Sequence, residues 1–134
     1  MEKTEAIKYC MDNYINYSRL IEGLLYPDYC LQVAILLHGA VKASSRTSKW
    51  GKIYLACMKS DCFHNMDLNP FVTMWEDAFP RNAASLNTFK NGIGEVRDSF
   101  SRKGTPIDTP QCMENRKATM NLSKSIKVAC RREE

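Results

Sequence analysis

Only a few side chains of this 134-residue chain have the type and spacing of metal ligands, and the closest set is Cys57, Cys62 and His64. Zinc usually takes four protein ligands from tighter pairs, such as two cysteines separated by two residues. No second pair of ligands follows nearby in the sequence, since the remaining cysteines stand alone. We therefore expect no metal site, and we interpret Cys57 as a core residue of a helix.

Catalytic chemistry has few candidates. The chain has two histidines, and a Cys62 thiol assisted by His64 is the one nucleophile pair that their spacing offers. We interpret His38 as a core histidine with a hydrogen-bond partner, because it lies in an apolar run. The sequence contains no glycine-rich phosphate loop, Ser-His-Asp set or paired-carboxylate motif. We predict that the protein is not an enzyme and needs no cofactor.

A different chemistry, the recognition of DNA, is indicated by small polar and basic residues between positions 81 and 97. Residues 81–94 contain no acidic side chain. Asn binds adenine with two hydrogen bonds, Ser and Thr bind several base edges, and Arg or Lys reads guanine or contacts phosphates. Two further basic residues follow in a polar turn. The candidate DNA contacts are Arg81, Asn82, Ser85, Asn87, Thr88, Lys90, Asn91, Arg97, Arg116 and Lys117.

The charge distribution supports this interpretation. The net charge is +4, but residues 1–40 carry three basic and five acidic side chains, whereas residues 81–132 carry eleven basic and four acidic ones. All six tyrosines lie at or before Tyr54. The basic part of the chain is therefore its C-terminal part, as expected for a partner that carries phosphates.

Apolar spacing predicts the elements that position these residues. Helices are expected over residues 2–25 and 29–42, joined as an antiparallel hairpin, and over residues 49–59 and 69–79. Leu86, Phe89, Ile93, Val96 and Phe100 recur every three or four residues, which predicts a helix over residues 82–103. Because two glycines weaken this helix, it depends on packing or lets another backbone approach closely.

The pattern then changes to period two. Residues 107–109 and 118–122 resemble two short strands, and residues 114–117 form a polar turn between them, so we expect a β-hairpin with a basic tip. The tail, residues 123–134, forms either a short final helix or a frayed end. The expected fold class is mainly α with a small β-hairpin (α+β), divided into residues 1–45, 46–125 and a basic tail at 126–134.

The order of these elements over residues 48–123 resembles the winged helix-turn-helix domains of bacterial and phage regulators. Within this stretch, Phe89 to Thr109 is similar to the end of a recognition helix followed by a Pro-Ile-x-Thr wing strand. The match departs at Ser99 and Phe100, where Leu is more usual. The resemblance implies that the helix over residues 82–103 lies in the major groove of double-stranded DNA. It also implies a wing over residues 105–123 along the DNA backbone.

We therefore expect a small transcriptional or replication regulator that binds double-stranded DNA. The alternative is a protein-interaction module that uses the same scaffold to dock on a partner protein. The helix over residues 29–42 is apolar on most faces, so either the rest of the chain or a second copy must cover it, and residues 3–42 could form a homodimer. No apolar run is long enough to span a membrane and no secretory signal opens the chain, so we predict a cytoplasmic protein.

Overall fold

The computed structural model describes residues 2–100 and 109–130, and these residues form helices and connecting loops. The elements are six α-helices and three 3-10 segments. They are α1 (Lys3–Asp12), η1 (Tyr17–Gly23), η2 (Pro27–Tyr29), α2 (Cys30–Lys42), α3 (Ser48–Lys59), α4 (Leu68–Ala78), η3 (Pro80–Asn82), α5 (Leu86–Phe100) and α6 (Pro110–Ala129). The described residues contain no sheet, and their one β-type contact is an isolated bridge between Leu24 and Phe63.

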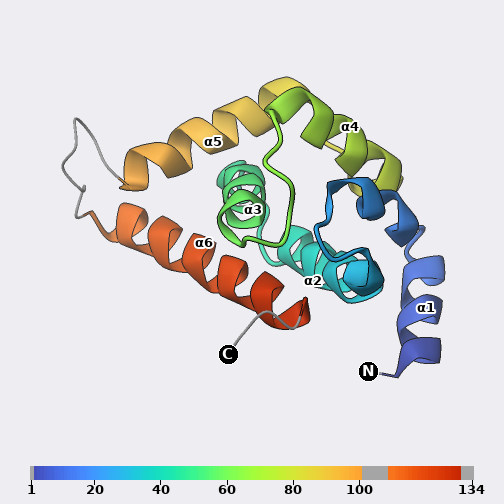
Figure 1. The fold of residues 1–134 in the computed structure, drawn as a ribbon. Helices are drawn as coiled ribbons and strands as arrows, with labels where there is room; N and C mark the ends of the chain where they lie inside the picture. The colour runs from blue at the N-terminus through green and yellow to red at the C-terminus, as the bar shows by residue number, and fades with distance from the viewer. Residues whose placement is uncertain (1, 101–108, 131–134) are drawn as a thin grey trace.

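Helix α3 lies at the centre of the molecule. Helices α5 and α6 both pack against it, and α2 packs on a further side (Figure 1). One apolar cluster extends from Ala6 to Cys130. Its densest part is a group of aromatic rings, in which Trp75 stacks on Phe79 with ring centroids 4.1 Å apart and Trp50 meets Phe89 at 5.1 Å. These rings join α3, α4 and α5 into one unit.

Two glycines let α3 and α5 approach unusually closely. A Cβ atom on Gly51 would lie 2.1 Å from the carbonyl oxygen of Gly92, and one on Gly92 would lie 2.5 Å from the carbonyl oxygen of Thr47. Gly94, on the same helix, has no atom within 4 Å of such a Cβ. The sequence predicted that this helix either depends on packing or lets another backbone approach closely. The close approach of another backbone applies to Gly92.

The first predicted helix, over residues 2–25, is wrong in its extent. Helix α1 ends at Asp12, and Tyr14 has a left-handed backbone with φ 56°. The chain then turns because Asn16 donates its backbone N–H to the carbonyl of Ala78 and its side-chain amide to that of Asp77, at 2.8 and 3.0 Å. These bonds satisfy carbonyl groups at the end of α4, so a tertiary contact overrides the helical periodicity.

The predicted β-hairpin is also wrong, and with it the α+β class, because residues 110–129 form the helix α6. Pro110 occupies the first turn, and the hydroxyl of Thr109 accepts the N–H of Cys112 as an N-cap. The buried stripe of α6 is mostly small and polar, so hydrophobic periodicity does not reveal it. It consists of Asn115, Thr119, Ser123 and Ile126. The wing therefore does not exist over residues 110–123, and residues 101–108 lie outside the described part of the chain.

Helix α2 is covered by its own chain. Val33, Ala34 and Leu37 are fully buried, and α1, η1, α3 and α6 pack around the helix. The sequence left open whether the rest of the chain or a second copy covers this apolar helix. The rest of the chain covers at least a large part of its surface. Within residues 2–100 and 109–130, no helix combines the length and apolar composition needed to cross a membrane.

Candidate nucleic-acid interface

The outer face of α5 carries the central part of the predicted DNA-contacting set. Asn87, Lys90 and Asn91 are exposed on its first two turns, whereas Phe89, Ile93 and Val96 are buried on the opposite face. The centre of the apolar stripe predicted for this helix is thus confirmed, while Leu86 and Phe100 at its ends are only partly buried. Figure 1 shows α5 along one edge of the molecule, where a large ligand can reach it. Its first two turns form a continuous polar surface without a carboxylate.

Two of the predicted contact residues form the N-terminal cap of α5. The Ser85 hydroxyl accepts the backbone N–H of Thr88 at 3.1 Å and lies 2.9 Å from the Thr88 hydroxyl. A side-chain oxygen in this position satisfies one of the N–H groups that a helix start leaves open. Both hydroxyls therefore fix where α5 begins, and the first turn is presented in a defined position.

Arg81 and Asn82 lie in η3, directly before α5. The Arg81 guanidinium stacks on the ring of Tyr14, with its central carbon 3.7 Å from the ring centroid, and it remains exposed. The carbonyl of Asn82 accepts the indole N–H of Trp75 at 3.0 Å. Stacking holds the cation beside the start of α5 without neutralising it, as a phosphate contact requires.

Lys90 and Arg97 follow one edge of the α5 face. They line a shallow cleft of about 400 Å³ together with Tyr54, Asp67 and Leu68. Burial raises the pKa of Tyr54, while the charge of Arg97 acts against this rise. Within the described part of the chain, neither Lys90 nor Arg97 forms an ion pair. Both cations are thus available to a negatively charged ligand.

The last two predicted contacts are not part of this face. Arg116 lies on α6, where its guanidinium donates to the carbonyl of Ser99 near the C-terminal end of α5. Lys117 is exposed on α6. Neither is at the tip of a hairpin, because α6 replaces the hairpin. Two carboxylates, Glu95 and Asp98, are exposed on the later turns of α5, so the polar surface free of acid is limited to its beginning.

The candidate metal and thiol chemistry is not assembled. Cys57 and Cys62 are buried, His64 is exposed, and burial raises the pKa of Cys57 far above its ordinary value. Among residues 2–100 and 109–130, no three His, Cys, Asp or Glu side chains are grouped to hold a metal ion. The core role predicted for His38 is confirmed, since it is buried and its Nδ1 lies 2.6 Å from the hydroxyl of Tyr9.

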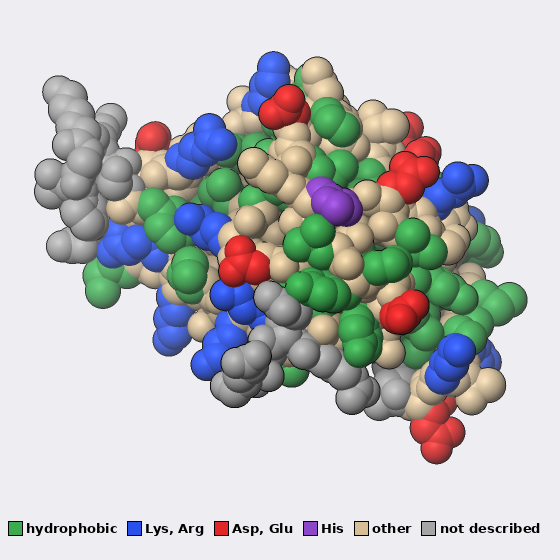
Figure 2. All heavy atoms as spheres, in the orientation of Figure 1, with side chains coloured by type: hydrophobic (Ala, Val, Ile, Leu, Met, Phe, Trp, Pro, Cys, Tyr) green, Lys and Arg blue, Asp and Glu red, His purple; other side chains and the backbone are tan. Residues whose placement is uncertain are grey.

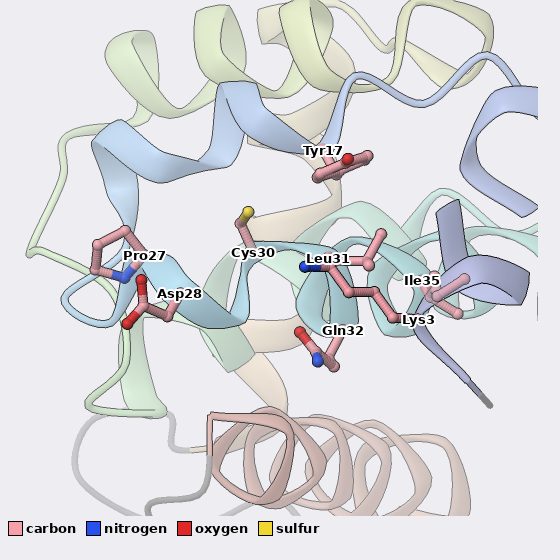
Figure 3. Close-up of a pocket in the computed structure, with 9 residues that line it drawn as sticks. Lys3, Tyr17, Pro27, Asp28, Cys30, Leu31, Gln32 and Ile35 are labelled. Atoms are coloured by element: carbon pink, nitrogen blue, oxygen red, sulfur yellow. The ribbon is translucent and has the colours of Figure 1, made fainter. Parts of the chain in front are cut away.

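A separate pocket of about 600 Å³ lies between α1, η1, η2 and α2. Figure 3 shows Lys3, Tyr17, Asp28, Cys30, Leu31 and Ile35 among the side chains that line it. Burial raises the pKa of Cys30, which keeps the thiol protonated and unreactive. The lining mixes single charges with apolar side chains and includes no unpartnered buried polar group. It indicates no particular chemistry.

Sequence reasoning missed two features of α6. Its outer side exposes Met113, Met120 and Val128, each about half exposed, while its inner side is polar. Its first turn also forms part of a polar cleft at the start of α3. Figure 2 shows Lys and Arg gathered over α6 and the adjoining end of α5. Of these features of α6, the sequence indicated only the excess of basic residues.

Comparison of the chain with protein-family models, curated proteins and solved structures finds no match.

Proposed function

We propose that the protein binds double-stranded DNA through the first two turns of α5, as a small regulator of transcription or replication. The observation that carries this proposal is the exposed, acid-free polar face with Asn87, Lys90 and Asn91. Amide side chains at the start of a helix can reach base edges in the major groove. Arg81 and Arg97 lie where they can contact phosphates on either side. This mode of binding uses no wing.

The proposal includes a homodimer through residues 3–42. Apolar side chains at the end of α1 and in the segment that leads to α2 remain exposed, at 70% for Met11, 44% for Ile21 and 42% for Leu25. A paired copy would cover them and would present two α5 faces to neighbouring half-sites. Sedimentation at micromolar concentration measures the mass, and a monomer mass would rule out the dimer.

We place this activity in the cytoplasm. All six cysteines are free thiols, and five of them are buried. Disulfides are rare in reducing compartments, which agrees with this placement.

A binding assay with matched variants tests the DNA proposal. Fluorescence anisotropy with fragments of the source genome is expected to show binding that weakens steeply as salt rises. Lys90→Ala should lower the salt slope by about 1. Asn87→Ala combined with Asn91→Ala should reduce sequence preference, with a cost of about 1–3 kcal/mol for each lost base contact. Lys59→Ala is the control, because Lys59 is exposed at the end of α3, outside both residues 3–42 and the first two turns of α5.

The competing function is docking on a protein partner through α6, and one observation favours it. This helix exposes Met113, Met120 and Val128 around Lys117 and Lys124, so its outer face suits an acidic, amphipathic partner. If Lys117→Ala with Lys124→Ala weakens DNA binding while Lys90→Ala does not, α5 is not the reading helix. An absence of any DNA binding at low salt would refute the DNA proposal.

A further inference from the structure

A polar cleft of about 590 Å³ lies where the loop before α3, the middle of α5 and the first turn of α6 meet. Hydroxyl, amide and thiol groups dominate its walls, and it contains one arginine and one glutamate. The lining residues include Arg46, Ser48, Glu95, Ser99, Gln111 and Cys112. This cleft is separate from the outer face of α5 to which DNA binding is assigned.

Ser48 provides the first indication of a ligand. Its side chain is 4% exposed, and its Oγ atom has no hydrogen-bond partner among the described residues. Buried hydroxyls are rarely left unpaired, because the lost contact with water is not replaced. Ser48 lines the cleft, so a group bound there could accept a hydrogen bond from its hydroxyl.

The backbone around Ser48 favours a negatively charged group. Ser48 is the first residue of the twelve-residue helix α3, and the N–H groups of Lys49 and Trp50 already bond to the carbonyls of Arg46 and Thr47. Within the described part of the chain, the N–H groups of Thr47 and Ser48 have no partner. The open N–H groups of a helix start, together with its dipole, form a site for anions.

Arg46 supplies a positive charge in a fixed position. Its guanidinium donates to the side-chain oxygen of Gln111 at 3.0 Å, and Gln111 donates in turn to Asn115 at 3.1 Å. Asn115 donates to Ser99 at 3.0 Å, which completes a chain of bonds across the cleft wall. The arginine still has free N–H groups, since a guanidinium carries five. It is therefore held ready to contact an oxyanion.

Cys112 also lines the cleft, and its polar neighbours favour the charged form of its thiol. The hydroxyls of Thr109 and Ser99, aided by the charge of Arg116, lower the pKa of its thiol, and Asp98 opposes the effect. Burial instead raises the pKa of Cys10 to about 11 and also raises that of Cys57. Cys112 lies in the first turn of α6 and lines the cleft.

We propose that the cleft binds an oxyanion, specifically a phosphate group, through the Ser48 hydroxyl, the start of α3 and the Arg46 guanidinium. Phosphate offers several acceptor oxygens and matches the fork of a guanidinium. The Glu95 carboxylate in the cleft is exposed, so water screens its repulsion of the anion. This inference does not depend on the DNA-binding proposal.

Alkylation of Cys112 reports on occupancy. Iodoacetamide reacts with thiolates, and a bound phosphate dianion would raise the pKa of Cys112 and shield it. Intact-mass measurements of the alkylation rate at pH 7, with inorganic phosphate titrated against chloride at constant ionic strength, are expected to show a saturable, several-fold slowing. A Cys112→Ser variant identifies which adduct is being followed. A rate that phosphate leaves unchanged would overturn the proposal.

Matched variants connect the effect to the named residues. Ser48→Ala and Arg46→Gln should each raise the half-saturating phosphate concentration about tenfold, while Ser125→Ala on the exposed side of α6 and Arg19→Gln should not. Ser48→Ala removes an unpaired hydroxyl, so its melting temperature should not fall, and this measurement verifies folding. Equal protection in all four variants would refute the site.

Different probes separate the possible sources of the phosphate. Phenyl phosphate should protect Cys112 if a phosphate monoester is the ligand, and acetate should protect it weakly. Protection by an oligonucleotide alone, with none by inorganic phosphate, would refute a small-anion site and would assign the cleft to the DNA interface. Loss of DNA binding in Lys90→Ala with unchanged phosphate protection would leave this site intact.

Discussion

The contact between α3 and α5 predicts opposite effects for two glycines that are two residues apart. Substituting Gly92 with Ala would place a Cβ 2.5 Å from the carbonyl oxygen of Thr47 and 2.8 Å from the backbone nitrogen of Gly51. Ordinary contact begins at 3.4 Å, and both obstacles are backbone atoms that cannot rotate away. The two helices must therefore separate by about 1 Å at their closest point, which opens the packing around them.

The expected magnitude follows from two opposing terms. Overpacking a core typically costs about 1–3 kcal/mol, while Ala stabilises a helix by about 1 kcal/mol relative to Gly. Gly92→Ala combines both terms, whereas Gly94→Ala gains the second term alone, because its Cβ meets nothing within 4 Å. We expect Gly94→Ala to be the more stable variant by about 1–3 kcal/mol. In a chain of this size, this difference corresponds to roughly 3–12 °C in melting temperature.

Thermal unfolding followed by circular dichroism, together with urea denaturation, measures this difference. Gly39→Ala in α2 is a second control, since its Cβ would also meet no atom within 4 Å. The two control variants should melt at or above the temperature of the unchanged protein, and Gly92→Ala should melt below both controls. If Gly92→Ala and Gly94→Ala were equally stable, α3 and α5 would not approach through these glycines, and the helical arrangement would be refuted.

Two further predictions concern buried polar groups. Burial, with a smaller contribution from the charge of Lys42, lowers the pKa of His38, so folding favours the neutral imidazole. The free energy of unfolding should therefore have its full value above about pH 6.5, the pKa of histidine in the unfolded chain, and should fall as the pH drops below that value. His38→Gln should flatten this dependence in urea titrations at several pH values, and an unchanged slope would contradict the assignment. Asn115→Ala should cost about 1–3 kcal/mol because it removes the buried bond from Asn115 to Ser99 together with the bond from Gln111. Asn121→Ala, exposed on the same helix, should cost little, and equal losses would show that the buried bonds contribute nothing.

The parts of the fold that could be predicted are those whose buried faces are apolar. Helices α3 and α4 lie within one residue of the predicted ends. In α5, which begins at Leu86 and not at residue 82, the predicted stripe residues Phe89, Ile93 and Val96 are buried, and Leu86 and Phe100 are partly buried. In each case, hydrophobic side chains recur at helical spacing and meet the aromatic cluster around Trp75. Hydrophobic burial and sequence pattern give the same answer there.

Prediction failed where polar contacts decide the structure. In α6, the alternation of Ala118, Met120 and Leu122 resembles a strand, but the residues that face the core are Asn115, Thr119 and Ser123. Asn115 donates to Ser99, which lies 16 residues away, and Thr119 donates to the carbonyl of Asn115 within the helix. The Ser99 partner is distant in sequence, so no local pattern can indicate it. The end of α1 has the same cause, since Asn16 bonds to the end of α4.

The two proposed surfaces differ in how far a local sequence pattern can indicate them. The exposed face of α5 could be predicted because it is the complement of an apolar stripe, whereas the cleft at Ser48 and Cys112 arises only from the packing of three separate segments. Helix α5 takes part in both, with Asn87 and Lys90 on its outer face and Ser99 in the cleft. Its position is fixed by the Gly51–Gly92 contact with α3. The stability of that contact therefore determines whether the outer face of α5 and the cleft are both held in a defined position. A destabilised Gly92→Ala variant tests this contact, on which both proposed surfaces depend.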